Sequence, residues 1–213
     1  MRRLVRAIAV VLIVILASAA AAIPALRAAA LQRVGRTLTD ADMPAAAAAD
    51  LLTMDVESGL AGALRVADLY REQPATVGVM VTRPTAIDAV LRQRGVAIPH
   101  VVRDALTQLG VPAKAIVEIP GGEGGTTETA GALADWSRAH RGKRVTVVVG
   151  PSHGRRYRRA LLRAWPNGEP PPRVVVTPYA LFKSDDWWQS RTTLREGLVE
   201  LEKLLLDYVA HPF

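Results

Sequence analysis

The sequence of 213 residues contains no cysteine. A chain without cysteine has neither a disulfide framework nor a thiolate metal site, so the composition excludes both. Such a chain folds equally well in reducing and oxidising surroundings, and its compartment has to be inferred from other features. The four histidines are scattered and show none of the spacings typical of a zinc site. We therefore predict no metal site from the sequence.

The part of the chain that is expected to fold has no large excess of charge. Residues 1–45 carry six arginines and two aspartates, whereas the remaining residues carry 21 basic and 18 acidic side chains, a net charge of only +3. Domains that bind nucleic acid usually present a strongly basic face. We therefore expect no nucleic-acid partner. The length and the 50% apolar content suit one hydrophobic core of ordinary size.

An apolar run from Ala7 to Leu26 follows three arginines, Arg2, Arg3 and Arg6. A run of about 20 residues is long enough to cross a hydrocarbon core of roughly 30 Å. Basic residues before a first membrane helix favour a cytoplasmic N-terminus, although three arginines beyond the run weaken this bias. We predict a signal-anchor helix over residues 1–27, a single pass through the cell membrane, and a periplasmic or otherwise extracytoplasmic C-terminal domain.

A cleaved signal peptide is the alternative for this segment. The alanine-rich stretch Ala17–Ala22 offers several small-residue cleavage sites. Both alternatives export the rest of the chain. Residues 28–47 contain Gly35, a polar run, Pro44 and several alanines, and we expect them to form a linker. The folded domain is then expected over residues 48–213.

Within that domain, short apolar runs alternate with helical patterns. We expect strands at 51–54, 76–82, 115–119, 144–150 and 173–177, and helices at 58–71, 84–94, 99–109, 126–140, 154–165 and 187–208. Valine-rich strands without polar alternation are typical of a parallel sheet that is buried on both faces. The pattern predicts an α/β fold with a Rossmann-like, doubly wound, mostly parallel five-stranded sheet, behind the N-terminal transmembrane helix.

Ligands of such folds bind at the carboxyl ends of the strands, where helices begin. The glycine-rich segment 121–128 lies at such a place, although it has no Gly-Lys-Ser/Thr motif of a phosphate-binding Walker loop. Thr126 and Thr127 are candidate ligand-binding residues there, and Glu128 is a candidate catalytic residue. The alternative is a flexible loop whose threonines only cap the following helix.

A second candidate segment, 150–156, follows the most valine-rich strand. His153 is a candidate catalytic residue because an imidazole transfers protons near neutral pH. Arg155 and Arg156 carry forked donors that suit a phosphate or a carboxylate. The alternative is a helix start with arginines that only face solvent.

These segments, in their order and spacing, resemble the ElyC/SanA/YdcF family of bacterial envelope proteins, a domain family of unknown function. The resemblance runs from about Ala49 to Tyr208. The segments of this sequence that match the family's motifs are residues 50–52 together with 65–70, residues 109–112 together with 115–116, and residues 126–130, 148–156, 186–191 and 200–208. It implies a Rossmann-like fold, often behind one membrane helix, and a role in cell-envelope or peptidoglycan biogenesis. Two segments depart from the family, since 55–59 and 82–84 stand where the family has glycine-rich turns.

Together these features predict an envelope protein whose pocket binds an anionic, phosphate-bearing ligand such as a lipid-linked precursor. The N-terminal helix would tether the protein to the cytoplasmic membrane, and the sequence leaves the cofactor unknown. Arg65 and Arg83 are further candidate ligand-binding residues. The alternative is a non-catalytic scaffold or binding module that has lost the glycine-rich loops.

Overall fold

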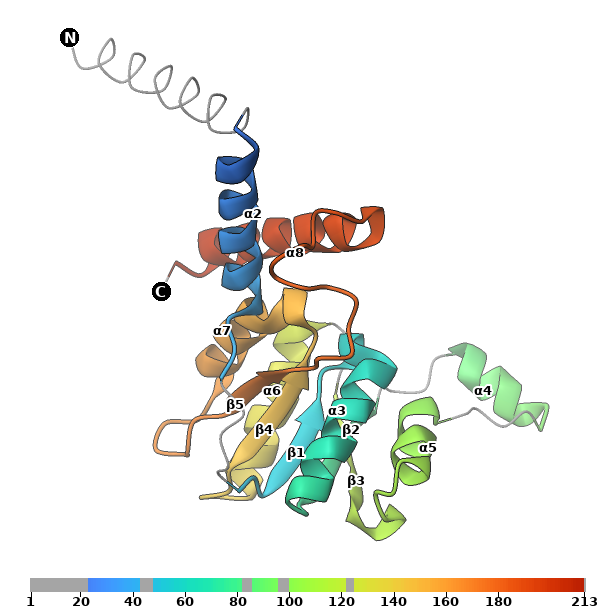
Figure 1. Cartoon of the computed structure of the whole chain (residues 1–213). Coiled ribbons are helices and arrows are strands. Elements are labelled where there is room, and N and C mark those ends of the chain that lie inside the picture. The colour runs from blue at the N-terminus through green and yellow to red at the C-terminus, as the bar shows by residue number, and fades with distance from the viewer. Residues whose placement is uncertain (1–22, 43–47, 82–85, 96–99, 122–124, 213) are drawn as a thin grey trace.

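The computed structural model describes residues 23–42, 48–81, 86–95, 100–121 and 125–212. Five strands form one sheet in the order β3-β2-β1-β4-β5 (Figure 1). Every neighbouring pair is parallel, so the sheet is wholly rather than mostly parallel. The strands are β1 (Leu51–Met54), β2 (Thr76–Val81), β3 (Ile116–Pro120), β4 (Val145–Val149) and β5 (Arg173–Val176).

The two central strands, β1 and β4, are buried along their whole length. Successive side chains of a strand point to opposite faces of the sheet. Leu51 accordingly lies in one core cluster and Leu52 in another. A strand that contributes to a core on both sides does not alternate between apolar and polar residues, which explains why β1 and β4 are apolar except for one buried threonine each, Thr53 and Thr146.

Helices cover both faces of the sheet (Figure 1). On one face, α3 (Gly59–Glu72) and α5 (Val101–Gln108) contribute Val66 and Leu106 to the core with Leu52. On the other face, α6 (Thr126–Ala139) and α7 (Gly154–Ala164) contribute Leu133 and Leu161 with Leu51. The connection from β2 to β3, which includes α5, also contains α4 (Ala86–Gln93), a helix without a buried residue. The α/β fold is thus confirmed, and its doubly wound arrangement is consistent with a Rossmann-like fold.

The structure differs from the expected linker over residues 28–47. Its larger part belongs to a helix, α2 (Pro24–Thr39), which begins with proline in its first turn. Leu38 of this helix is buried beside Phe182, Trp187 and Leu204 in a third core cluster. Alanine favours helix strongly, and a buried face for α2 exists only once this cluster has formed. Residues 43–47 of the expected linker lie outside the described residues.

The last helix, α8 (Arg191–Ala210), begins after Ser190, whose hydroxyl accepts a hydrogen bond from the Thr193 amide. It therefore starts four residues later than the predicted 187. Trp187 precedes the helix and is buried in the third cluster.

Within the described ranges, no helix combines the length and the apolar character needed to cross a membrane. Residues 1–22, which carry most of the expected anchor over residues 1–27, lie outside those ranges, and residues 24–27 belong to α2. The anchor therefore stays a prediction.

Candidate functional site at the switch point of the sheet

The strand order places β1 between β2 and β4. The chain runs from β1 outward to β2 and β3, and then returns to the other side of β1 as β4. Such a reversal, a topological switch point, is where ligands bind in open α/β sheets. The segment 55–58 follows β1 and a short 3-10 helix, Pro151–His153, follows β4 at this point. The α8 helix packs against that short helix, so residues from three distant parts of the sequence meet here.

His153 lies at the centre of this meeting point and is only 3% exposed. Its Nδ1 atom is 3.0 Å from Oε2 of Glu200 and 2.9 Å from Nη2 of Arg156. Its Nε2 atom is 3.3 Å from Oγ1 of Thr126 and 3.5 Å from Oδ2 of Asp55. The ring therefore has one nitrogen facing α8 and the other facing the segment after β1 and the first residue of α6.

Glu200 and Arg156 hold this side of the site together. Burial alone would raise the pKa of Glu200, but hydrogen bonds from His153, Arg156 and Lys203 outweigh it and hold that pKa well below its ordinary value. Arg156 donates to Glu200 through Nε at 3.0 Å and Nη2 at 3.2 Å, and to Oγ1 of Thr126 through Nη1 at 2.5 Å. Arg156 thus joins α6, α7 and α8.

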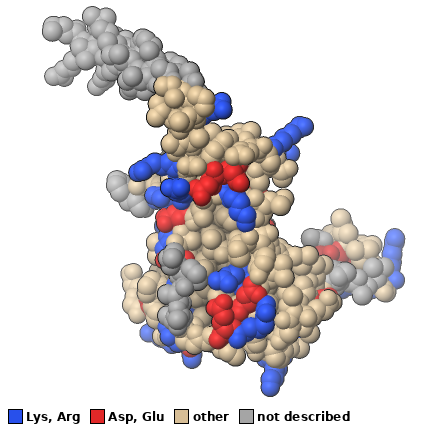
Figure 2. Space-filling model, in the orientation of Figure 1, with Lys and Arg blue, Asp and Glu red and all other residues tan. Residues whose placement is uncertain are grey.

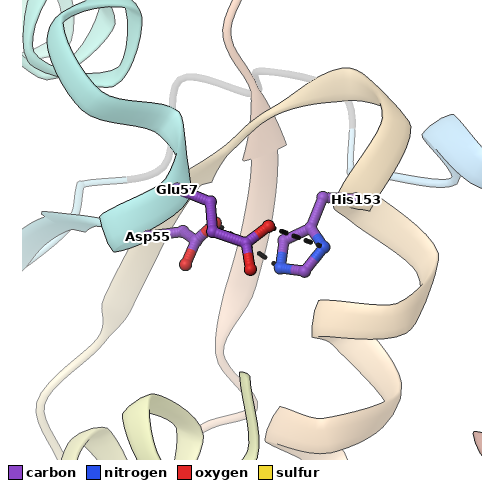
Figure 3. A group of neighbouring side chains, drawn as sticks. All are labelled: Asp55, Glu57 and His153. Carbon is purple, nitrogen blue, oxygen red and sulfur yellow. Dashed lines mark ion pairs between the residues drawn. The ribbon is translucent and has the colours of Figure 1, made fainter. Parts of the chain in front are cut away.

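Two carboxylates approach His153 from the end of β1 (Figure 3). The Asp55 side chain is 4% exposed, and its Oδ2 atom has no hydrogen-bond partner. Burial raises the pKa of this carboxyl above its ordinary value, against the opposing attraction of His153. Glu57 is about half exposed, with Oε2 4.0 Å from Nδ1 of His153. On balance the neighbours of His153 are therefore acidic rather than cationic.

Asp55 and Glu57 were not among the residues predicted for the site. The sequence analysis noted the segment 55–59 only because it lacks the glycines of the resembled family. Asp55 could have been predicted, because a carboxylate that directly follows a buried central strand lies at the ligand-binding edge of a parallel sheet. The only signal for Glu200 was its place in the segment 200–208 of the family resemblance, because it lies 47 residues from His153 on a helix with an ordinary amphipathic pattern.

Three predicted residues, Thr126, His153 and Arg156, come together as described. Arg155 does not point into the same cluster, since it donates to the hydroxyl of Tyr208 at 3.0 Å and pairs with Asp40 at 3.5 Å.

None of the other predicted residues that the structure describes contacts His153. Arg65 is 3.9 Å from Glu72 on its own helix, α3. Glu128 is exposed, and no contact within the described ranges joins it to His153. Arg83 lies outside the described residues. Thr127 is exposed on the first turn of α6 and lines a groove beside the site.

That groove has a volume of about 340 Å³ and runs between the start of α6, α7 and α8. Its lining combines hydroxyl and charged side chains with a short apolar stretch: Thr126, Thr127, Arg156, Ala160, Arg163, Lys203, Leu206, Asp207 and Ala210. A groove lined by both cationic and aliphatic side chains suits a ligand that has an anionic head and an apolar stem.

The comparisons with known proteins assign no family to this arrangement. The chain matches no protein-family model, no curated protein and no solved structure.

Proposed function

We propose that this chain is a membrane-tethered envelope protein that binds a phosphate-bearing ligand, such as a lipid-linked envelope precursor, in the groove beside Thr126. The observation that carries the proposal is the composition of this groove. The lining of the groove includes two predicted residues at the start of α6, Thr126 and Thr127, together with the cations Arg156 and Lys203. The envelope location rests on the predicted anchor and on the family resemblance.

The first turn of α6 supports binding of an anion. The first hydrogen bond at this end of the helix runs from the Thr129 amide to the Gly125 carbonyl. The amides of residues 126–128 therefore have no acceptor inside the helix, as at the start of any helix. Free amides and the positive end of the helix dipole together favour a phosphate.

The rest of the groove supports an apolar stem on that phosphate. Ala160, Leu206 and Ala210 also line the groove, and Leu206 is 60% exposed. Covering Leu206 with an alkyl chain removes apolar surface from water, which is favourable by about 25 cal/mol for each Å². A polyprenyl phosphate meets both requirements, because its charge and its hydrocarbon are adjacent.

To test the proposal, binding of farnesyl phosphate to the purified full chain in detergent is measured by calorimetry. We expect Lys203→Ala to weaken binding about tenfold, the effect of losing one charge-assisted contact. Thr127→Ala should weaken it less, and Arg141→Ala, an exposed cation beyond the other end of α6, should leave it unchanged. Farnesol, which has no phosphate, should bind far more weakly. Equal binding by Lys203→Ala and the unaltered chain, or of farnesol and its phosphate, contradicts the proposal.

A non-catalytic scaffold is the second candidate. One observation in its favour is that Arg156 already donates to Glu200 and Thr126. Another is that the carboxylates Asp55 and Glu57 stand where the resembled family has a glycine-rich turn. In the same experiment, this alternative predicts no binding of farnesyl phosphate, farnesol or inorganic phosphate.

A further inference from the structure

A buried carboxylate with one oxygen that has no hydrogen-bond partner lies at the switch point. The Asp55 amide donates to the Val148 carbonyl at 2.9 Å, so its backbone is fixed to the central strand β4. Its side chain is 4% exposed, yet Oδ2 has no hydrogen-bond partner. Buried charges in proteins are normally paired or coordinate metals, because leaving one unsatisfied costs several kcal/mol. A missing partner of Asp55 is therefore expected.

The atoms around Asp55 have the spacing of metal ligands. One atom from each of Asp55, Glu57 and His153 can be chosen so that all three lie within 4.8 Å of one another (Figure 3). Ligand atoms that share one ion at about 2.0–2.2 Å lie about 3–4.4 Å apart. Oδ2 of Asp55 and Nε2 of His153, at 3.5 Å, already meet this range. Glu57 is 52% exposed, and its Oε2 atom lies 4.0 Å from Nδ1 of His153, so its side chain has to turn toward Nε2 to complete the set.

The opposite side of the imidazole has the partner that a metal-binding histidine needs. Nδ1 of His153 is 3.0 Å from a buried carboxylate oxygen of Glu200. A histidine that coordinates a metal usually donates its other ring N–H to a carboxylate, which fixes the tautomer. Arg156 also approaches Nδ1, but it has acceptors of its own in Glu200 and Thr126. With the proton on Nδ1, the lone pair of Nε2 faces Asp55.

We propose that Asp55, Glu57 and His153 bind a divalent cation at the switch point of the sheet, with Glu200 as the residue that orients the imidazole. One imidazole and two carboxylates suit Mn²⁺ or Zn²⁺ better than Mg²⁺ or Ca²⁺, which prefer oxygen ligands alone. Three protein ligands leave coordination positions for water or for a ligand oxygen. This site goes beyond the phosphate-binding groove, and its test requires no phosphate ligand.

The experiment titrates Mn²⁺ alone into the full chain, after treatment with a chelator, and follows the binding by calorimetry and electron paramagnetic resonance. We expect one Mn²⁺ for each chain, and a spin-echo modulation from one directly bound imidazole nitrogen. Glu57→Gln should weaken binding at least tenfold and, because Glu57 is half exposed, should not disturb folding. Asp55→Asn should abolish binding and, because it removes a buried charge whose Oδ2 atom has no hydrogen-bond partner, should leave the metal-free chain folded.

Glu202→Gln, an exposed carboxylate on α8, is the matched control and should bind Mn²⁺ as the unaltered chain does. His153→Ala should remove the nitrogen modulation. Three results would overturn the site: no binding of Mn²⁺ at millimolar concentration, unchanged affinity in both carboxylate variants, or bound Mn²⁺ without an imidazole nitrogen. Loss of farnesyl phosphate binding has no bearing on these outcomes, so the two proposals fail separately.

Discussion

At the scale of single residues, two glycines decide how closely α2 and α8 approach Trp187. A Cβ atom at Gly35 of α2 would lie 2.8 Å from Cδ1 of Trp187, and one at Gly197 of α8 would lie 2.4 Å from its Cε3. The indole also donates from Nε1 to the Leu31 carbonyl at 2.9 Å. Trp187 thus fills the space that both glycines leave, and this contact fixes α2 on the domain.

Gly197→Ala should therefore destabilise the chain. The added methyl group overpacks a buried contact, which costs about 1–3 kcal/mol and outweighs the gain in helix propensity of up to about 1 kcal/mol. Unfolding in urea, followed by tryptophan fluorescence, measures the difference.

Gly131→Ala in α6 provides the control for this prediction. A Cβ atom there would meet no atom within 4 Å, so only the helix propensity changes and a stabilisation of up to about 1 kcal/mol is expected. Equal effects of the two substitutions would contradict the packing role of Gly197.

At the scale of elements, α7 is a cationic helix whose charges are used inside the molecule. Each of its five arginines pairs with a carboxylate on another segment: Arg155 with Asp40, Arg156 with Glu200, Arg158 with Asp42, and Arg159 and Arg163 with Asp207. Acidic and basic side chains accordingly lie next to one another on the surface (Figure 2). These pairs join α7 to the chain after α2 and to α8, and they leave no unpaired arginine stripe on α7 for nucleic acid.

Asp207 is the shared partner of two of these arginines. Burial alone would raise its pKa, but hydrogen bonds from Arg163 and Arg159 outweigh this and hold the pKa below its ordinary value. A lowered carboxyl pKa stabilises the folded chain at pH values above the unfolded pKa of about 4, and this stabilisation is lost as the pH falls through the folded pKa.

Asp207→Asn should therefore lower the free energy of unfolding at pH 7 by about 1.5–3 kcal/mol, the contribution of hydrogen bonds to charged groups. The difference from the unaltered chain should shrink below about pH 4. Urea unfolding across pH 3–7 measures both effects. Asp135→Asn removes an exposed pair within α6 and should cost less than about 1 kcal/mol at any pH. A difference that is constant with pH would contradict this role of Asp207.

At the scale of the whole molecule, the compartment decides which substrates the site can meet. Three arginines before a long apolar run predict that the domain lies outside the cytoplasm. The test fuses a reporter to the C-terminus of the chain in a bacterium. Alkaline phosphatase, which matures only outside the cytoplasm, should be active, and a cytoplasm-dependent fluorescent protein should be dark.

The control for the compartment is a chain that lacks residues 1–22, with the same two reporters. It should give the opposite pattern, because the apolar run is gone. A bright fluorescent fusion of the full chain would place the domain in the cytoplasm, and it would remove the envelope role while leaving both the groove and the cation site to be tested.

The sequence by itself determined the sheet and part of the site. The apolar character of β1 and the valine-rich run of β4 indicated burial on both faces, and therefore a parallel sheet under two layers of helices. Thr126, His153 and Arg156 could be predicted because each lies just beyond a strand, and the carboxyl ends of parallel strands share one edge.

Only the tertiary structure decided what surrounds His153. Local patterns specify strands and helices but not the order of strands, and it is the placement of β4 beside β1 that brings Asp55 and Glu57 to the imidazole. The contact with Glu200 exists because α8 packs across the end of β4, a long-range contact that no local period encodes. For the same reason α2 resembled a linker, since the surface that it buries is assembled from Phe182, Trp187 and Leu204, far along the chain.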